Sequence, residues 1–340
     1  KIIHKQDAAD KKSPLLDQIL EIPYSNYSTI TEVSALNEWI DKIKERGYFA
    51  VDTETTSLNE LKADLVGVSL AVYPGEACYI PLGHSNGNEE MENFFDPGNV
   101  DPIQLNKSLV LNKLKPLLES DSIIKIGQNI KYDIKIFHQN GIKLINIDDT
   151  MLMSYALHAG LHRHNMNLLS ELYLKHEPIT IKSLIGTGKT SITFEKVPIS
   201  TASPYASEDA DITLRLWHIF KPLLYQNKVA KVYESMERPL IGVLSEMELR
   251  GIAVNQLHLA EMSKKLEIKI TVLEEKIHAL AGEHFNIGSP KQLGDILFNV
   301  LQIDEKAKTT KTGQFKTDEA TLSKLKNEHE IIDKILNYRQ

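Results

Sequence analysis

The sequence predicts an α/β domain with a mixed sheet flanked by helices, followed by a smaller and mostly helical unit. Three β-rich runs, at residues 48–54, 65–73 and 77–82, come first, and helix and strand then alternate. From residue 149 onward, apolar residues recur almost entirely at helical spacing. A chain of 340 residues also exceeds one ordinary core, which favours two domains.

The first elements lead into the sheet. Residues 1–26 carry charge, two prolines and little periodicity, so we expect a linker with one short helix near residues 15–20. A strand at 27–31 precedes an amphipathic helix, which Gly47 should end. A Pro-Gly pair at 74–75 separates the second and third β-rich runs, as in an antiparallel meander.

The next elements alternate between helix and strand. After a polar loop at 83–101, we expect a helix at 109–120, a strand at 123–127 and a helix that begins near Ile130. The helical region that follows is interrupted by a loop at 187–200.

We expect the domain boundary between residues 225 and 250, because Gly251 interrupts the helical periodicity there. The predicted organisation is therefore a linker at 1–26, a sheet domain at 27–225 and a helical unit at 226–340. The helical unit should contain a long helix from about residue 257 to 281.

The composition is typical of a soluble cytoplasmic protein. No apolar run approaches the ~20 residues that a membrane span requires, and no secretory signal is found. The single cysteine, Cys78, rules out an internal disulfide, which fits a reducing compartment, and its apolar surroundings predict a buried thiol. The net charge of −7 lies in residues 1–254, which hold 33 acidic and 26 basic residues. Nucleic acid is still an acceptable partner, because metal ions bound by carboxylates reverse the local field.

Two acids end the first β-rich run. Side chains alternate along a strand, so Asp52 and Glu54 point to one face and Thr53 to the other. The strand is apolar before them, which places both acids at its carboxyl end, where α/β folds hold ligands. The alternative interpretation is a solvated strand end, since acids usually stay exposed.

Two further pairs of residues are four apart, which stacks each pair on one helix face: Asn129 with Asp133, and Tyr205 with Asp209. Asp209 can then share a metal ion with the strand acids, while Tyr205 holds an attacking water molecule. A half-buried helix tyrosine is the alternative for Tyr205.

The neighbouring acids Glu208 and Asp211 project elsewhere on the same helix, and we expect them to face solvent or to act as caps.

The four other acids, Asp52, Glu54, Asp133 and Asp209, carry hard oxygen ligands of the kind that Mg²⁺ and Mn²⁺ accept. Two such cations about 3.5 to 4 Å apart can clamp both oxygens of a phosphoryl displacement. The constellation predicts a two-metal phosphodiesterase site.

Together, three segments resemble a known family. The strings DTET, GQNIKYD and YASEDAD are similar, in order and spacing, to the three exonuclease motifs of the DEDD superfamily in its tyrosine subclass. Residues 27–340 also resemble the large (Klenow) fragment of bacterial DNA polymerase I, a family A polymerase, in LVGVSLAVYPGEACYIPLGH, DDTMLMSYAL, LLSELYLKH, ERPLIGVLSEMELRGIAV and FNIGSPKQLGDILF. The resemblance implies a ribonuclease H-like fold and 3′ to 5′ exonuclease activity.

The resemblance also assigns roles to single residues. Asp52, Glu54 and Asp209 would hold one divalent cation, Mg²⁺ or Mn²⁺, and Asp52 would bridge to a second cation held with Asp133. Tyr205 would orient the nucleophilic water. The resemblance further implies a group of substrate contacts. Leu58 and Phe194 would be apolar wedges against the terminal base, Asn129, Lys131 and Arg163 would lie near the primer terminus and its phosphates, and Thr53 would be a further substrate contact.

The helical unit resembles the first half of the polymerase thumb. Its run KAKTTKTGQFK holds four lysines and no acid, and we expect Lys308, Lys311 and Lys316 to contact the phosphates of duplex DNA. A solvated surface loop is the alternative. The strings DYSQIELR and HDE, which carry the polymerase metal ligands of the family, do not occur. We expect a piece of a longer protein, and no polymerisation by this piece.

Two sequence patterns suggest other ligands, and both are rejected. GTGKT at 186–190 imitates the end of a P-loop, but the earlier glycine is missing and no strand precedes it. His158, His162 and His164 suggest zinc, but Gly160 breaks the helix between the first two and no cysteine is near.

Two alternative functions stay open: an exoribonuclease similar to ribonuclease D, and a non-catalytic module that only holds DNA. The preferred partner is DNA with a single-stranded or frayed 3′ end. The protein itself is expected to be a monomer that is associated with the nucleoid in the bacterial cytoplasm.

Overall fold

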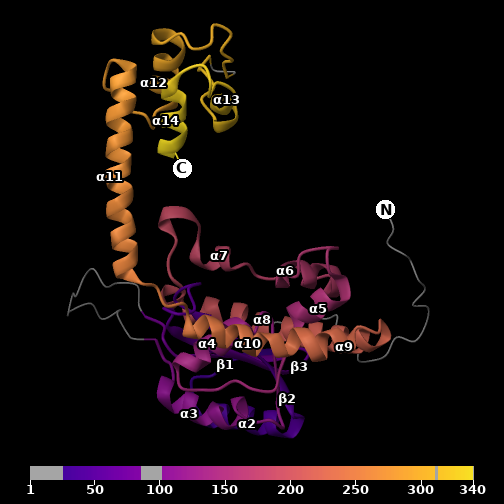
Figure 1. Cartoon of the computed structure of the whole chain (residues 1–340). Coiled ribbons are helices and arrows are strands. Elements are labelled where there is room, and N and C mark those ends of the chain that lie inside the picture. Colours follow the sequence, from indigo (N-terminus) through magenta and orange to yellow (C-terminus); the bar gives the residue numbers. More distant parts are fainter. Residues whose placement is uncertain (1–25, 86–101, 311–312, 340) are drawn as a thin grey trace, which may run out of the picture. The chain divides into compact units, whose positions relative to one another are not determined.

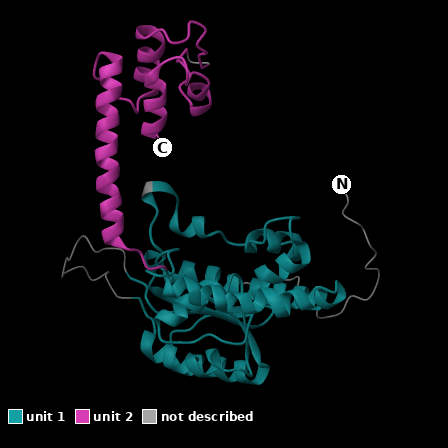
Figure 2. Ribbon diagram, in the orientation of Figure 1, with its two compact units in different colours: residues 1–251 teal, residues 252–340 magenta. Residues whose placement is uncertain are grey.

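The computed structural model describes residues 26–85, 102–310 and 313–339. The expected short helix at 15–20, and the loop at 83–101 apart from its first three residues, lie outside this part of the chain. Two compact units are divided between Gly251 and Ile252 (Figure 2). No helix in the described ranges is both long enough and apolar enough to cross a lipid bilayer.

The first unit contains a mixed six-stranded sheet with the order β1-β4-β3-β2-β5-β6 (Figure 1). Strands β2, β3 and β4 form the expected antiparallel meander, whereas β1, β5 and β6 pair with their neighbours in parallel. Strand β6 was not expected, because three residues are too few for a periodic signal. The strands are β1 Tyr27–Thr29, β2 Tyr48–Thr55, β3 Leu65–Tyr73, β4 Glu76–Pro81, β5 Ile124–Gly127 and β6 Ile147–Asp149.

The helices of the first unit lie close to the ranges that the sequence predicted. Gly47, in the left-handed conformation with φ of 75°, ends α2 as predicted. The α-helices of this unit are α2 Val33–Arg46, α3 Lys107–Leu118, α4 Lys131–Gln139, α5 Thr150–His158, α6 Met166–Leu169, α7 Ile181–Ile185, α8 Ile199–Gln226, α9 Ala230–Val232 and α10 Arg238–Arg250. Shorter helical turns are η2 Ser170–Leu174, η3 Gly188–Thr190, η4 Phe194–Lys196 and η5 Tyr233–Glu237.

The two faces of the sheet are covered differently (Figure 1). Helices α2, α3 and α4 cover a face of large apolar side chains, which include Phe49, Val51 and the buried thiol of Cys78. On the other face, α8 packs across β1 to β5, and Ala50 and Ala210 belong to a cluster of mostly small side chains there. Because alanines occupy little space, the backbone of α8 lies close to the strands.

The sequence led us to expect Asp211 in solvent or at a cap. It is instead fully buried between α8 and the sheet. Its carboxylate accepts hydrogen bonds of 2.8 Å from the hydroxyl of Tyr27 and from the backbone N–H of Gly75. It also pairs with Arg215 at 3.0 Å, one turn along the helix. The prediction was wrong because β1 and the β3–β4 turn cover this face of α8.

Glu208 is also fully buried, contrary to the prediction. It accepts hydrogen bonds from His176 Nε2 at 2.6 Å and from the backbone N–H of Ile179 at 2.7 Å. Its carboxylate therefore fastens the segment before α7 to α8.

The second unit is helical, with its own core. The long helix α11 begins and ends within one residue of the expected range. Its elements are α11 Gln256–Ala281, α12 Pro290–Gly294, η6 Asp295–Val300, α13 Glu319–Lys324 and α14 Glu330–Arg339, and buried residues such as Ile277, Leu297 and Ile332 form the core.

The lysine-rich run lies between η6 and α13. Thr309 and Phe315 form an isolated antiparallel bridge, and the N–H of Lys316 bonds to the carbonyl of Lys308 at 2.9 Å. Both lysines are exposed, whereas Lys311 lies outside the described residues.

We predict that Asp211→Ala destabilises the first unit by about 3 kcal/mol, because it deprives the buried guanidinium of Arg215 of this carboxylate. Urea denaturation followed by circular dichroism measures the change. The control Glu246→Ala removes an exposed acid that pairs with Arg250, and should cost less than about 1 kcal/mol. Equal effects of the two substitutions would contradict a structural role for Asp211.

Candidate active site

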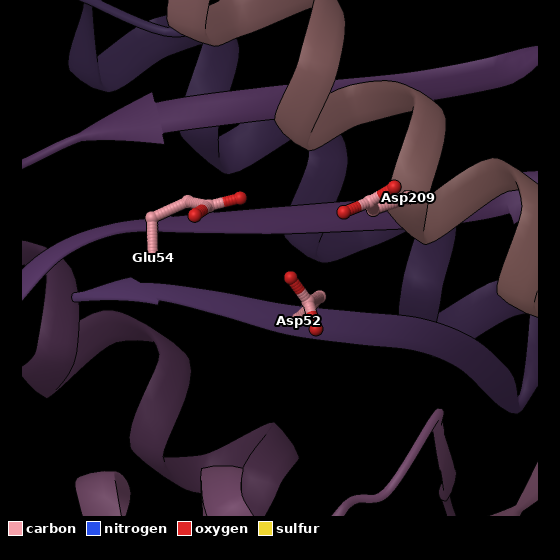
Figure 3. A group of neighbouring side chains, drawn as sticks. All are labelled: Asp52, Glu54 and Asp209. Atoms are coloured by element: carbon pink, nitrogen blue, oxygen red, sulfur yellow. The ribbon is translucent and has the colours of Figure 1, made fainter. Parts of the chain in front are cut away.

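Three acids from two elements meet on the α8 face of the sheet. Asp52 and Glu54 project from β2, and Asp209 projects from α8 toward them (Figure 3). One ligand oxygen from each residue lies within 4.8 Å of the other two. Among the described residues, these three acids form the group of potential metal ligands whose ligand atoms lie this close together. The structure therefore brings together the acids of the first and third motifs.

Strand alternation explains why these side chains meet. Ala50, Asp52 and Glu54 are every second residue of β2, so all three face α8, while Thr53 faces the opposite side. Ala210 packs in the same cluster as Ala50 and directly follows Asp209. The close packing of small side chains thus brings the helix acid within reach of the strand acids.

Burial and mutual repulsion change the acidity of the three groups. Burial raises the pKa of Asp52 to about 7. Burial, followed by the charges of Asp52, Asp209 and Asp133, raises the pKa of Glu54 well above its ordinary value. Burial and then the charge of Asp52 do the same for the pKa of Asp209. Three carboxylates held this close are therefore costly to ionise without a compensating cation.

A divalent cation fits this donor set. The three carboxylates supply hard oxygen atoms, which Mg²⁺ and Mn²⁺ prefer. Glu54 is 7% exposed, and within the described part of the chain its buried Oε1 atom has no hydrogen-bond partner. A buried carboxylate oxygen without a donor is well suited to metal coordination, because a cation would provide the missing interaction.

Asp133 approaches from the other side of β2. It lies in the first turn of α4, is buried, and accepts a hydrogen bond of 2.5 Å from Thr53 Oγ1. Burial and then the charge of Asp52 raise the pKa of Asp133 well above its ordinary value, so the two acids are electrostatic neighbours. Asp133 is nevertheless not part of the three-acid cluster.

The spacing predicted that Asn129 and Asp133 share a helix face, but they do not. It lies before α4, which begins at Lys131, and its φ of 62° is left-handed. Asp149 imposes this arrangement, because its carboxylate accepts hydrogen bonds from the backbone N–H groups of Ile130 at 2.9 Å and Asn129 at 3.3 Å.

Asp149 is a site-supporting residue that the sequence analysis missed. It also accepts a hydrogen bond from the N–H of Leu152 at 3.1 Å, as the N-cap of α5, and it is 1% exposed. An aspartate directly before a predicted helix is a local capping signal, which could have identified it.

Tyr205 occupies the position that its spacing predicted, one helical turn before Asp209 on α8. Its hydroxyl lies beside the carboxylate of Asp209, and its ring centroid lies 6.0 Å from that of Phe194. Burial, and then the charges of Asp209 and Glu54, raise the pKa of Tyr205 far above its ordinary value. The residue is therefore a neutral phenol at every physiological pH.

The two expected wedge residues differ. Leu58 is 93% exposed, in the loop that follows β2. Phe194 is 4% exposed and packs against Tyr205 and His84. The short turn η4 folds onto α8, and this aromatic ring lies in a local core there.

The expected phosphate contacts lie near the start of α4. Asn129 is exposed, and Lys131, the first residue of α4, forms an ion pair of 2.5 Å with Glu248 of α10. Arg163 is exposed beside His164, whose carbonyl accepts a hydrogen bond of 2.8 Å from the amide of Gln128. That bond places the Arg163 loop next to the segment that carries Asn129.

The rejected patterns have ordinary surroundings. The GTGKT segment follows helix α7 rather than a strand and forms the short turn η3. The rings of His158, His162 and His164 neighbour one another, with centroids 5.5 and 5.0 Å apart, but they are not among the ligand groups that meet the distance criterion within the described residues.

The fold and the acid cluster define the class of protein: a nuclease with a ribonuclease H-like sheet. A family model described as 3′-5′ exonuclease matches residues 27–225, and a model of DNA polymerase family A matches residues 256–340. The chain therefore belongs to the 3′-5′ exonuclease family of family A DNA polymerases.

Its relatives include the DNA polymerase I of Rhizobium leguminosarum, which is 43% identical over 94% of this chain and 32% of its own length. The DNA polymerase I of Pseudomonas aeruginosa is 39% identical over 92% of this chain and 34% of its own length. The chain thus spans about a third of these relatives.

A solved structure has the same fold. It is the POL domain of Pol1 from M. smegmatis in complex with DNA primer-template and dNTP, with a TM-score of 0.65 and 22% identity. The match covers 92% of this chain and 47% of that one.

Divalent cations should stabilise the protein, because they neutralise carboxylates that repel one another. In a chelator, Asp209→Asn removes one of these charges and should raise the melting temperature by about 2 to 4 °C, the shift expected for about 1 kcal/mol. Mg²⁺ or Mn²⁺ should then raise the melting temperature of the unchanged protein by more than that of the variant. Scanning calorimetry measures both effects.

The control for this experiment is Asp41→Asn, which neutralises an acid whose side chain is 75% exposed and should match the unchanged protein with and without metal. An equal metal-induced rise in the Asp209→Asn variant would exclude Asp209 as a ligand.

Proposed function

We propose that this chain hydrolyses the 3′-terminal phosphodiester of DNA stepwise and releases nucleoside 5′-monophosphates. The observation that carries the proposal is the cluster of Asp52, Glu54 and Asp209 with the hydroxyl of Tyr205 beside it. Membership of the exonuclease family supports the same reaction. In a longer polymerase, this activity would serve as proofreading during replication and repair.

The acids would hold two divalent cations, Mg²⁺ or Mn²⁺. Asp52, Glu54 and Asp209 would bind one, and Asp52 and Asp133 the other. Cations in these positions would supply Lewis-acid chemistry, which lowers the pKa of the attacking water and stabilises charge on the departing 3′ oxygen. The hydrogen bond from Thr53 uses one oxygen of the Asp133 carboxylate, and a carboxylate has further lone pairs that can bind a cation.

Tyr205 would orient the attacking water rather than remove its proton. Because the pKa of Tyr205 is raised, the hydroxyl stays protonated and a phenolate base is not formed. Its hydroxyl lies beside Asp209 of the cluster, where the phenol can donate a hydrogen bond to water or accept one from it. Glu54, which projects from β2, would hold the same water from the strand side.

The substrate would be a single-stranded or frayed 3′ end. Leu58, at 93% exposure, would wedge against the terminal base, and Asn129, Lys131 and Arg163 would lie along the phosphates. Contacts of this kind tolerate any sequence, because every base has an apolar face for stacking. A mismatched end frays at lower cost than a paired one and would enter the site more readily.

The second unit would contribute affinity for duplex DNA. The exposed lysines Lys308 and Lys316 would contact phosphates, together with Lys311. The chain would act as a monomer in the bacterial cytoplasm, as the exonuclease segment 27–225 followed by the start of a polymerase domain at 226–340.

We predict that Asp52→Ala abolishes the release of nucleotides from 5′-labelled single-stranded DNA, because it removes a ligand shared by both cations. Tyr205→Phe should slow the reaction only tenfold to a hundredfold, roughly the value of one hydrogen bond. A gel assay with Mg²⁺ or Mn²⁺ measures both, and Glu246→Ala is the active control. A loss in Tyr205→Phe as large as that in Asp52→Ala would contradict the orienting role.

DNA and RNA of the same sequence should behave differently. We expect the chain to degrade the DNA strand and to leave the RNA strand nearly intact in the same gel assay, since the 2′-hydroxyl distinguishes the two. Rapid loss of RNA beside intact DNA would favour an exoribonuclease similar to ribonuclease D. No product from either strand, with Asp52→Ala unchanged in every property, would favour a module that only holds DNA.

A further inference from the structure

The loop that presents Leu58 directly follows the two strand acids. It runs from Thr56 to Asp64 between β2 and β3, and it is closed at its base by a hydrogen bond of 3.0 Å from the N–H of Thr56 to the carbonyl of Asp64. A second bond of 2.9 Å, from the N–H of Ala63 to the carbonyl of Asn59, closes a turn inside it. We call residues 56–64 the wedge loop.

One face of α4 holds the wedge loop on both sides of Leu58. The hydroxyl of Tyr132 donates a hydrogen bond of 2.6 Å to the carbonyl of Ser57. One turn later, Lys135 forms an ion pair with the carboxylate of Glu60, and the amide of Gln139 donates to the backbone carbonyl of Glu60. Residues at this spacing lie on one side of a helix, so α4 is a continuous support for the loop.

Lys135 is the centre of this support. Its side chain is only 2% exposed, and its ammonium group lies between the carboxylates of Glu60 and Glu248. A buried cation is tolerated only beside an opposite charge, and each of the two acids supplies one. Glu248 also pairs with Lys131, which ties α10 to the first turn of α4, where Asp133 lies.

We propose, on the basis of the exonuclease function above, that Lys135 is a positioning residue that fixes Leu58 at the entrance of the site. Through Glu60 it holds the wedge loop, and through Glu248 it anchors the loop to α10. A fixed wedge matters for a paired 3′ end, whose terminal base has to be separated from its partner, and much less for a strand that is already single.

The test uses Lys135→Met in the full chain. Methionine has a similar shape without the charge, and the two acids it leaves are 30% and 39% exposed, so water can solvate them. We expect the rate on a paired 3′ end to fall about tenfold, with the rate on single-stranded DNA nearly unchanged. Lys62→Met, an exposed lysine of the same loop, is the matched control and should change neither rate.

A double variant separates positioning from a general structural effect. If Lys135 acts through Leu58, then Lys135→Met should cause no further loss in a Leu58→Ala background, because the two changes remove one interaction. Equal losses on paired and single-stranded ends, or losses that add in full, would overturn the proposal.

Hydrogen exchange tests the proposal even without a catalytic readout. The amides of Thr56 and Ala63 should exchange faster in Lys135→Met and in Glu60→Gln, while β2 stays protected. Glu60→Gln leaves Lys135 paired with Glu248, so this variant keeps the buried charge compensated. Unchanged exchange in both variants would overturn the proposal, whereas an inactive parent chain with a loosened loop would overturn only the exonuclease function.

Discussion

The repulsion among three carboxylates held close together by packing is the constraint on which the rest of this molecule depends. Asp52, Glu54 and Asp209 have ligand atoms within 4.8 Å of one another in surroundings that raise the pKa of each. Such a cluster opposes folding, so the surrounding structure has to hold it in place. Helix α8 does so, because alanines on the helix and on the strands let it lie close to the sheet.

The same helix is fastened by two acids that take no part in the cluster. Asp211 binds β1, the turn after β3 and Arg215, while Glu208 binds the segment before α7. Neighbouring acids of one helix thus have different roles, because two of them attach the helix to other segments and one belongs to the acid cluster. Glu208 and Asp211 are satisfied by protein donors, whereas Asp209 faces other carboxylates, and this difference marks the position that needs a cation.

The opposite face of β2 is organised by α4. Thr53 reaches through this face to Asp133, and Tyr132 and Lys135 reach the loop beyond the strand. A single short helix therefore supports both the second acidic motif and the exposed leucine. Its own start is set by Asp149, whose carboxylate binds the backbone N–H groups before the helix.

Local sequence was sufficient for the features that depend on local periodicity. Strand alternation placed Asp52 and Glu54 on one face, and a spacing of four residues placed Tyr205 beside Asp209, because both periods are properties of the backbone. Contacts between segments that are distant in the sequence decided the rest. The burial of Glu208, Asp211 and Phe194, the left-handed start before α4 and the pairing of Lys135 all need partners from segments far away in the chain. Residue spacing carries no information about such partners, since burial is set by what packs against an element.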